Sequence, residues 1–240
     1  AQAIAEQYRP RGAGDAPPQS PAGVLLAIAD KMDNLAACFR LGMAPTGSTD
    51  PFALRRQAQG IVEILMAAGL HPNLRVLIGQ ALDLVPDPEP AREKDAERVL
   101  SAGAAAEALL AFFAQRIDFL LTRDGVAYDV SRAVLRAPWS DALEVYERGQ
   151  FIQRFRAEEP AVFDQLVTAA ERPARITRPE NLSAGSSPDP ALFEDEWESK
   201  LWEVSRDAGS MVDAALNQQP KDYRTAAVAL ANLAEPIHAF

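Results

Sequence analysis

The sequence predicts an all-α fold of two packed helical bundles, and three observations support this prediction. Alanine and leucine dominate the composition while valine and isoleucine are sparse, which favours helix. Apolar residues recur at spacings of three and four along most of the chain, as on the buried face of a helix. No segment gives a convincing strand pattern, and no internal repeat is evident. A proline-rich stretch, VPDPEP at 85–90, separates the two predicted bundles.

The overall composition is that of an ordinary globular protein. The 240 residues are 48% apolar and 24% charged, enough for one large domain or two small ones. No apolar run approaches the roughly 20 residues of a membrane span, and the first residues lack a signal-peptide pattern. We therefore expect a cytoplasmic protein with no membrane partner. The chain does not begin with Met, so we expect a fragment of a longer protein.

The single cysteine, Cys38, excludes an internal disulfide and a thiolate metal cluster. It lies on an apolar helical face, which favours a buried small hydrophobe over a nucleophile. The net charge of −10 argues against casual binding to nucleic acid. Its distribution is uneven, because residues 110–178 carry ten arginines against ten carboxylates, whereas 179–240 are strongly acidic. A phosphate-binding face is possible in the middle section if folding gathers its arginines on one side.

The first helices follow from local signals. Residues 1–8 resemble the end of a helix, and 9–21 form a loop in which Ser20 can cap the next helix, 22–41. Gly42 closes that helix. We expect the following side chains to face the core from it: Val24, Leu25, Ile28, Met32, Leu35, Cys38 and Phe39.

The stretch 44–56, APTGSTDPFALRR, is expected to begin as a turn and end as a helix start. Ser48, Thr49 or Asp50 can act as the N-cap, and Pro51 suits the first helical position. Arg55 and Arg56 then lie in the first turn, where the helix dipole favours anions instead. Either a carboxylate partner or an anionic ligand is required there, and local physics does not choose between them.

Two further helices complete the first predicted bundle. Residues 51–68 place Leu54, Ile61, Ile64 and Leu65 inward and end at Gly69, and 73–84 form the next helix. The proline-rich linker then predicts domains at 1–86 and 87–240.

The second predicted bundle contains longer helices. A wide apolar stripe through Leu109, Phe113 and Leu120 predicts a buried helix within 91–123. Asp129 is expected to cap a short helix at 130–137. The remaining predicted elements are helices at 139–156 and 161–171, a loop at 172–190, a long acidic helix from Asp189 and Pro190 to about 217, and a last helix at 221–234.

Catalytic and metal-binding patterns are missing from the sequence. It contains no glycine-rich phosphate loop, no HExxH and no His-Asp pair, and its two histidines, His71 and His238, lie far apart. Asp30 and Asp33 flank Lys31 on one helix and are candidate acid–base groups, although a solvated helix face is the commoner explanation. We therefore expect no catalytic residue and no metal ligand in this chain.

The arginines after residue 110 are the main candidates for binding. Arg132 and Arg136 are four residues apart, so they share a helix face. Arg148, Arg154 and Arg156 follow on the next predicted helix. Glutamates at 144, 147, 158 and 159 alternate with them, so the residues by themselves favour a salt-bridged surface over an RNA-binding face.

Two stretches shift that balance. Residues 27–35, AIADKMDNL, and 44–56 resemble the signature of the beta subunit of bacterial glycyl-tRNA synthetase, which reads ALADKLDTL and then PTGSKDPFALRR. Thr49 stands where the family has lysine. Residues 3–10 resemble the family's AIxEHYxP, with Gln7 in place of histidine, and looser similarities at 129–135 and 233–237 extend the resemblance over nearly the whole chain.

The resemblance implies a division of labour. In this family a separate alpha subunit carries the catalytic site for glycine and ATP, and the beta subunit binds tRNA in an expected alpha2beta2 glycine–tRNA ligase. On this basis residues 1–86 are the end of a helical domain similar to HD phosphohydrolases. Residues 87–240 resemble the helical anticodon-binding domain of arginyl-tRNA synthetase. We expect no cofactor in this chain, since ATP and Mg²⁺ act through the alpha subunit.

The resemblance also assigns roles to residues. The expected tRNA(Gly) phosphate contacts are Arg132, Arg136, Arg148, Arg154 and Arg156. The family motif contributes Asp30, Lys31, Asp33, Arg55 and Arg56 as structural residues, with Arg55 and Arg56 expected to pair with Asp30 or Asp33. Two alternatives stay open: a helical protein-protein scaffold whose acidic final third binds a basic partner, and a residual phosphohydrolase activity in the first 86 residues.

Overall fold

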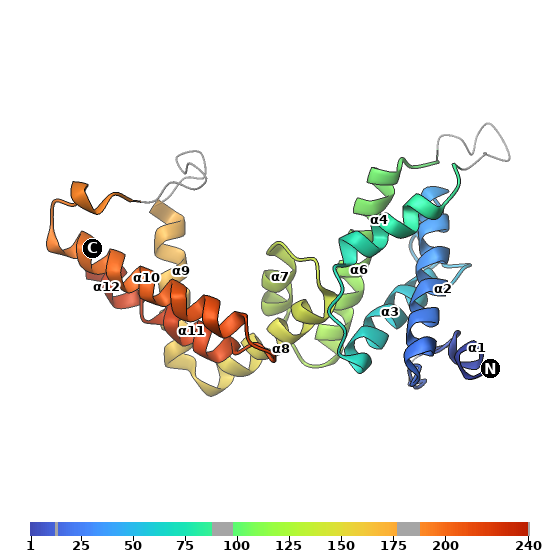
Figure 1. Cartoon of the computed structure of the whole chain (residues 1–240), viewed down its shortest axis with the longest axis horizontal. Coiled ribbons are helices and arrows are strands. Elements are labelled where there is room, and N and C mark those ends of the chain that lie inside the picture. The colour runs from blue at the N-terminus through green and yellow to red at the C-terminus, as the bar shows by residue number, and fades with distance from the viewer. Residues whose placement is uncertain (13, 88–97, 177–187, 240) are drawn as a thin grey trace. The chain divides into compact units, whose positions relative to one another are not determined.

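The computed structural model describes residues 1–12, 14–87, 98–176 and 188–239 (Figure 1). Within these ranges the regular elements are helices, and an isolated bridge between Thr46 and Thr49 is the sole β-type pairing. The prediction of an all-α fold is confirmed. Contacts divide the chain into two compact units, Ala1–Gln150 and Phe151–Phe240, and the boundary falls inside helix α8 (Ala142–Glu158).

The first unit is built around α6. Its helices are α1 (Gln2–Glu6), α2 (Pro21–Arg40), α3 (Leu54–Ala68), α4 (Leu74–Leu84), α6 (Ala102–Arg123), α7 (Tyr128–Arg136) and the first part of α8. Helix α6 packs against α2, α3, α4 and α7. The Phe39 and Phe112 ring centroids, on α2 and α6, are 5.2 Å apart. Helix α6 therefore covers part of the apolar surface of each of these helices, and α2 also packs on α3 and α4.

The predicted apolar faces of α3 and α6 are confirmed. Leu54, Ile61 and Leu65 on α3 are buried, as are Leu109, Phe113 and Leu120 on α6. On α2 the prediction is wrong for Leu25, which is 67% exposed. Its neighbours Val24 and Ala27 face the core instead, and Leu25 lines an open apolar groove of about 730 Å³ between α2, α3 and α4.

Local capping signals account for several helix ends of this unit. The Ser20 hydroxyl accepts a hydrogen bond from the Gly23 amide at 3.0 Å, and Gly69 adopts the left-handed conformation at the end of α3, with φ 61°. Both predicted caps are confirmed. Helix α6 begins at Ala102 rather than 91, because Ser101 caps it by accepting from the Ala104 amide. Residues 91–97 of the predicted helical segment lie outside the described residues.

Two other predicted starts in the first unit are wrong. Helix α7 begins at Tyr128, with Ala127 at its N-cap, so Asp129 lies in the first turn and does not cap it. Helix α8 begins at Ala142 rather than 139, because the Asp141 carboxylate accepts from the Glu144 amide at 3.0 Å. In both cases the helix starts within one turn of the expected position.

The second unit packs the last part of α8 with the remaining helices. These are α9 (Pro160–Ile176), the 3₁₀ turn η2 (Pro190–Leu192), α10 (Glu196–Leu216), α11 (Tyr223–Ala231) and α12 (Ala234–Ala239). Helices α10 and α9 both pack on α11, and α12 contacts α9 and α10. The Phe155 ring lies 5.2 Å from Phe151 and 6.5 Å from Phe163 between centroids. At the surface of this unit, Arg224 of α11 forms a two-bond ion pair with Glu159, at 2.7 and 2.9 Å.

The predicted loop 172–190 is shorter than expected. Helix α9 continues through Pro173 to Ile176, and the Arg172 guanidinium donates to the Ile237 carbonyl of α12 at 3.2 Å. Proline within the last turn removes one helical hydrogen bond, and we attribute its tolerance to this packing against α12. Residues 177–187 lie outside the described part of the chain.

Two more boundaries in the second unit differ from the predictions. The long acidic helix begins at Glu196 rather than Pro190, because Asp195 and Glu198 form a capping box. The predicted last helix, 221–234, is the shorter α11, and the helix α12 that follows it was not predicted. Pro236 then lies in the first turn of α12, where the missing amide hydrogen costs little.

The predicted domain boundary at 86 and 87 differs from the boundary between compact units at 150. Helix α6 belongs to the predicted second domain but packs into the first unit. A compact unit can contain parts of two domains, so the boundary between units does not test the predicted domain boundary. The division at 86 and 87 stays a prediction. None of the helices in the described ranges combines the length and the apolar character that a membrane span requires.

Candidate nucleic-acid interface

Helix α7 presents two of the predicted arginines to solvent. Val130 and Val134 are buried on its inner face, whereas Arg132 and Arg136 are exposed on the outer one, as their four-residue spacing predicts. Tyr128, one turn before Arg132, is 68% exposed. The Arg132 guanidinium lies 5.5 Å from the Tyr128 ring centroid and donates to its hydroxyl at 2.9 Å. An exposed aromatic ring beside one cation, with a second cation on the same helix face, suits a nucleic-acid ligand.

Arg148 has a structural role that the sequence did not indicate. Its side chain is half-buried, and the guanidinium donates to the Val134 carbonyl at 3.3 Å. That carbonyl belongs to the last turn of α7, where helical partners are missing and a cation complements the dipole. Arg148 therefore caps α7 from α8, and only its remaining donors are available to a ligand.

Arg154 and Arg156 are exposed near the end of α8, in the second unit. They are two residues apart, so they project in different directions around the helix. Phe155 between them is buried against Phe151 and Phe163. The structure thus places Arg132, Arg136 and Arg148 in one unit and Arg154 and Arg156 in the other. Arg132 and Arg136 share a helix face because they are four residues apart, whereas Arg154 and Arg156 do not.

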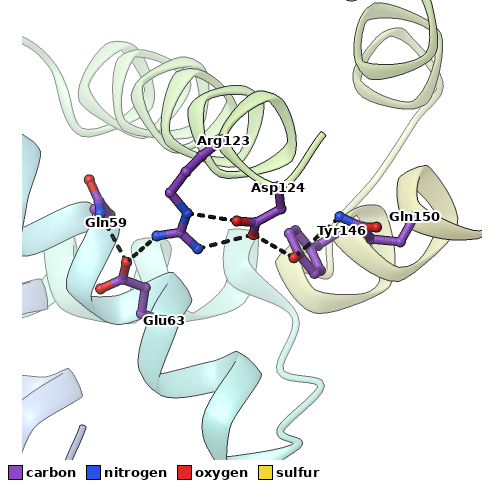
Figure 2. A network of polar contacts seen from close by, with 6 residues as sticks. All are labelled: Gln59, Glu63, Arg123, Asp124, Tyr146 and Gln150. Atoms are coloured by element: carbon purple, nitrogen blue, oxygen red, sulfur yellow. Dashed lines mark hydrogen bonds and ion pairs between the residues drawn. The ribbon is translucent and has the colours of Figure 1, made fainter. Parts of the chain in front are cut away.

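A polar network that the sequence did not reveal joins α3, α6 and α8 (Figure 2). The Arg123 guanidinium makes two hydrogen bonds to Asp124, at 2.8 and 3.0 Å, and one to Glu63 at 3.1 Å. Asp124 also accepts from the Tyr146 hydroxyl at 2.6 Å. Gln59 and Gln150 extend the network at its two ends, with bonds to Glu63 and Tyr146. The network fixes the start of α8, and therefore Arg148, against α6.

The pKa shifts in this network follow from its contacts. Burial, followed by the hydrogen bond to Asp124, raises the pKa of Tyr146 to about 12. The hydrogen bonds from Arg123 lower the pKa of the Asp124 carboxyl, and those to Asp124 raise the pKa of Arg123. Arg123 therefore bridges two carboxylates, Asp124 and Glu63, with a single positive charge.

The segment 44–56 forms a helix start of a different kind from the one predicted. The Asp50 carboxylate accepts hydrogen bonds from the Leu54 and Arg55 amides, at 2.8 and 3.0 Å. Helix α3 begins at Leu54, three residues after Pro51, because Ala53 adopts a left-handed conformation with φ 54°. Of the three candidate caps, Asp50 supplies the oxygens, and the chain between Asp50 and Leu54 is a turn.

The expected pairing of Arg55 and Arg56 with Asp30 or Asp33 is wrong. The Arg55 guanidinium donates to the Gly47 carbonyl at 2.7 Å, and that of Arg56 donates to the Arg11 carbonyl at 3.4 Å. Asp30 instead accepts from the Gln7 amide at 2.9 Å. The turn at 46–50 places the Gly47 carbonyl against Arg55, whereas the carbonyl that reaches Arg56 belongs to Arg11, in the segment before α2.

Lys31 ties α2 to the segment before it. The residue is 4% exposed, and its ammonium donates to the carbonyls of Gln7 and Arg9, at 3.2 and 2.8 Å. Burial lowers its pKa. These contacts give Lys31 a structural role, in line with its position in the motif, and leave it no access to a substrate.

The surroundings of Asp30 do not fit a metal ion. Its neighbour Gln7 offers an amide where the resembled pattern has histidine. Within the described ranges no three His, Cys, Asp or Glu side chains lie together as a metal site requires. The geometry therefore gives no support to a phosphohydrolase centre at this position.

Comparison with known proteins gives a consistent result. The family model described as "Glycyl-tRNA synthetase beta subunit" matches residues 1–136. A curated glycine–tRNA ligase beta subunit from Halalkalibacterium halodurans is 35% identical over the whole chain and 33% of its own length. One from Desulforudis audaxviator is 35% identical over 100% of the chain and 33% of its own length. One from Solidesulfovibrio magneticus is 37% identical over 88% of the chain and 30% of its own length. The chain thus spans about a third of the length of these relatives.

Proposed function

The chain belongs to the family of glycyl-tRNA synthetase beta subunits, and from this premise we propose that it is a tRNA-binding part of such a subunit. Its partner is tRNA(Gly). The glycine–tRNA ligase reaction, which uses ATP and Mg²⁺, then belongs to the complex with the alpha subunit, in a cytoplasmic alpha2beta2 assembly. The chain itself supplies recognition, and the chemistry takes place on the alpha subunit.

One observation carries the proposal beyond family membership. Helix α7 holds Tyr128, Arg132 and Arg136 at four-residue spacing on its exposed face, while its other face is buried against α6. Guanidinium groups form two-bond contacts with phosphate, and an exposed tyrosine ring stacks on an unpaired base. Arg148 supports this face by capping α7. Arg154 and Arg156 are proposed as further phosphate contacts made by the second unit.

The experiment measures the affinity of the full chain for tRNA(Gly) at several salt concentrations. Replacing Arg132 and Arg136 together by alanine should weaken binding and lower the slope of log affinity against log salt by about 0.9 for each duplex phosphate that the variant no longer neutralises. Arg75→Ala is the matched control, because Arg75 is an exposed arginine of the same unit, on α4, that pairs with Glu107. Unchanged affinity and slope in the double variant would remove α7 from the interface.

A footprint separates the anticodon assignment from other modes of binding. Protection of the anticodon arm by the chain is expected, whereas protection confined to the acceptor arm contradicts the assignment of residues 87–240. A chain that binds no tRNA but captures a basic protein would favour the scaffold alternative, in which the acidic final third is the docking surface.

A further inference from the structure

A second group of arginines lies outside the α7 face, where α3 begins beside α6. Arg55 and Arg56 in the first turn of α3 and Arg123 on α6 line a cavity of about 330 Å³. Gln59, Glu63 and Phe119 line the same cavity. Its volume is at the small end of the range for ligand pockets, about 300–1000 Å³.

The carboxylates around this cavity are already used. Glu63 accepts hydrogen bonds from Arg123, which it shares with Asp124, and from Gln59 (Figure 2). Asp50 is occupied by the Leu54 and Arg55 amides. None of these acidic groups forms an ion pair with Arg55 or Arg56 in the part of the chain that the structure describes.

In the described residues, the charges of Arg55 and Arg56 are therefore not compensated by an ion pair, and most of their N–H donors are unused. Each guanidinium carries five N–H donors, and within the described ranges each makes one hydrogen bond, to a backbone carbonyl that bears only a partial charge. Both residues lie in the first turn of α3, where the helix dipole already contributes positive potential. The Asp50 carboxylate lies at the same helix start and compensates part of this positive charge, and a bound phosphate would compensate the rest.

Arg116, on α6, is a fourth arginine in this region and acts electrostatically on Arg55. Its guanidinium lies 5.5 Å from the Phe112 ring centroid, and its Nε is buried without a hydrogen-bond partner in the described residues. Burial and the neighbouring charge of Arg55 both lower the pKa of Arg116. The Asp50 carboxylate opposes this lowering, and a phosphate bound beside Arg55 would oppose it further.

The cavity also has an apolar wall. Phe119, on α6, is a lining residue with 50% of its surface exposed. An aromatic ring next to unpaired guanidinium groups is the combination that binds a nucleotide, because the ring stacks on the base while the cations take the phosphate.

We propose that this cavity binds one unpaired nucleotide of an RNA, with its phosphate on Arg55 and Arg56 and its base against Phe119. This inference rests on the proposed function, because it takes RNA as the partner, and it adds a contact site in the first unit that is separate from the α7 arginines. Arg116 adds positive potential behind Arg55, and the Arg123–Glu63 pair fixes the wall of the cavity.

The test compares variants of the full chain by fluorescence anisotropy with labelled tRNA(Gly) over a range of salt concentrations. Arg55→Ala combined with Arg56→Ala should weaken binding about tenfold and lower the salt slope by about 0.7 for each single-stranded phosphate that the variant no longer neutralises. Phe119→Ala should weaken binding at least about fivefold and leave the slope unchanged, because stacking involves no counterion release. Phe119→Trp keeps the ring and should retain affinity, and Arg75→Ala serves as the control for removal of a surface arginine.

The outcomes separate this inference from the proposed function. If the Arg55 and Arg56 double variant binds with wild-type affinity and slope while the Arg132 and Arg136 double variant is weakened, the cavity is excluded and the α7 face stands. If the wild-type chain binds no tRNA, the proposed function itself fails. If the arginine double variant unfolds, Phe119→Ala still tests the site, because Phe119 is half exposed and its replacement should leave the fold intact. Undiminished binding by Phe119→Ala would overturn the site.

Discussion

Glu6 shows how one carboxylate holds the start of the chain in place. It accepts hydrogen bonds from the Ser20 hydroxyl and amide, at 2.5 and 3.0 Å, and from the Gln2 side chain at 3.0 Å. The hydrogen bond from the Ser20 hydroxyl is the largest cause that lowers the pKa of Glu6 to about 2. Because Ser20 also caps α2, the same group links α1 to the first turn of that helix.

The lowered pKa of Glu6 predicts a specific dependence on pH. A carboxylate whose pKa is lower in the folded state stabilises the fold above its unfolded pKa, and this contribution disappears as the pH falls through the folded pKa. The contribution of Glu6 should therefore be complete above about 4.5 and lost on approaching about 2. Glu6→Gln should be less stable than wild type at pH 7, and the difference should vanish near pH 2.

Urea unfolding of both proteins at pH 7, 4 and 2 measures this effect. Asp83→Asn is the control, because Asp83 is an exposed carboxylate of the same unit with no hydrogen bond in the described ranges. If Glu6→Gln and wild type differ by the same amount at every pH, the stabilisation does not come from the charged form of Glu6.

Arg148 and Arg123 illustrate why single arginines are hard to assign from sequence. Both lie in the section where ten arginines face ten carboxylates, yet one caps a helix and the other joins three helices through Glu63 and Asp124. Arg55 and Arg56 were expected to pair with Asp30 or Asp33, and they donate to the Gly47 and Arg11 carbonyls instead. The partner of a long cationic side chain depends on which helix packs opposite it, and the linear spacing carries no such information.

At the level of elements, the caps determine where each helix begins. The clearest case is α10, in which the Asp195 carboxylate accepts from the Trp197 and Glu198 amides at 2.7 and 3.0 Å. The Glu198 side chain in turn accepts from the Asp195 amide at 3.2 Å. The pattern of Asp followed three residues later by Glu is visible in the sequence, and it outweighs the Asp189-Pro190 signal that we used to place the start of this helix.

Removal of this cap should loosen the first turn of α10. Asp195→Ala should cost about 1 kcal/mol locally, equivalent to about fivefold faster amide hydrogen exchange at Trp197 and Glu198. Glu194→Ala is the matched control, because it removes a neighbouring acidic side chain that makes no hydrogen bond in the described part of the chain. Equal acceleration in both variants would show that general loss of negative charge, not the cap, is responsible.

For the whole molecule, α6 decides how the chain divides into stable parts. It covers the apolar faces of α2, α3 and α4, so a fragment that ends before it leaves those faces in water. We expect residues 1–150 to unfold cooperatively with dispersed amide NMR signals, and residues 1–86 to lack both properties. Thermal melting and NMR spectra of the two fragments measure this. A cooperatively folded 1–86 fragment would contradict the expectation and support an independent domain ending at the proline-rich linker.

The sequence by itself determined the features that depend on neighbouring residues. Helical spacing predicted the buried faces of α3 and α6, and the caps at Ser20 and Gly69 were legible in single residues. The motif at 44–56 resembled the family to which the chain belongs, since a motif is a local string. The α7 face, with Arg132 and Arg136, was predicted in the same way from a four-residue period.

Only the tertiary structure decided which distant groups meet. It placed backbone carbonyls rather than Asp30 or Asp33 against Arg55 and Arg56, and it assembled the network from Glu63 to Tyr146 out of three helices. It also put α6 into the first compact unit. The physical reason is that a long side chain or an apolar stripe has several partners of equal chemistry along the chain, and the packing of helices in space selects one of them.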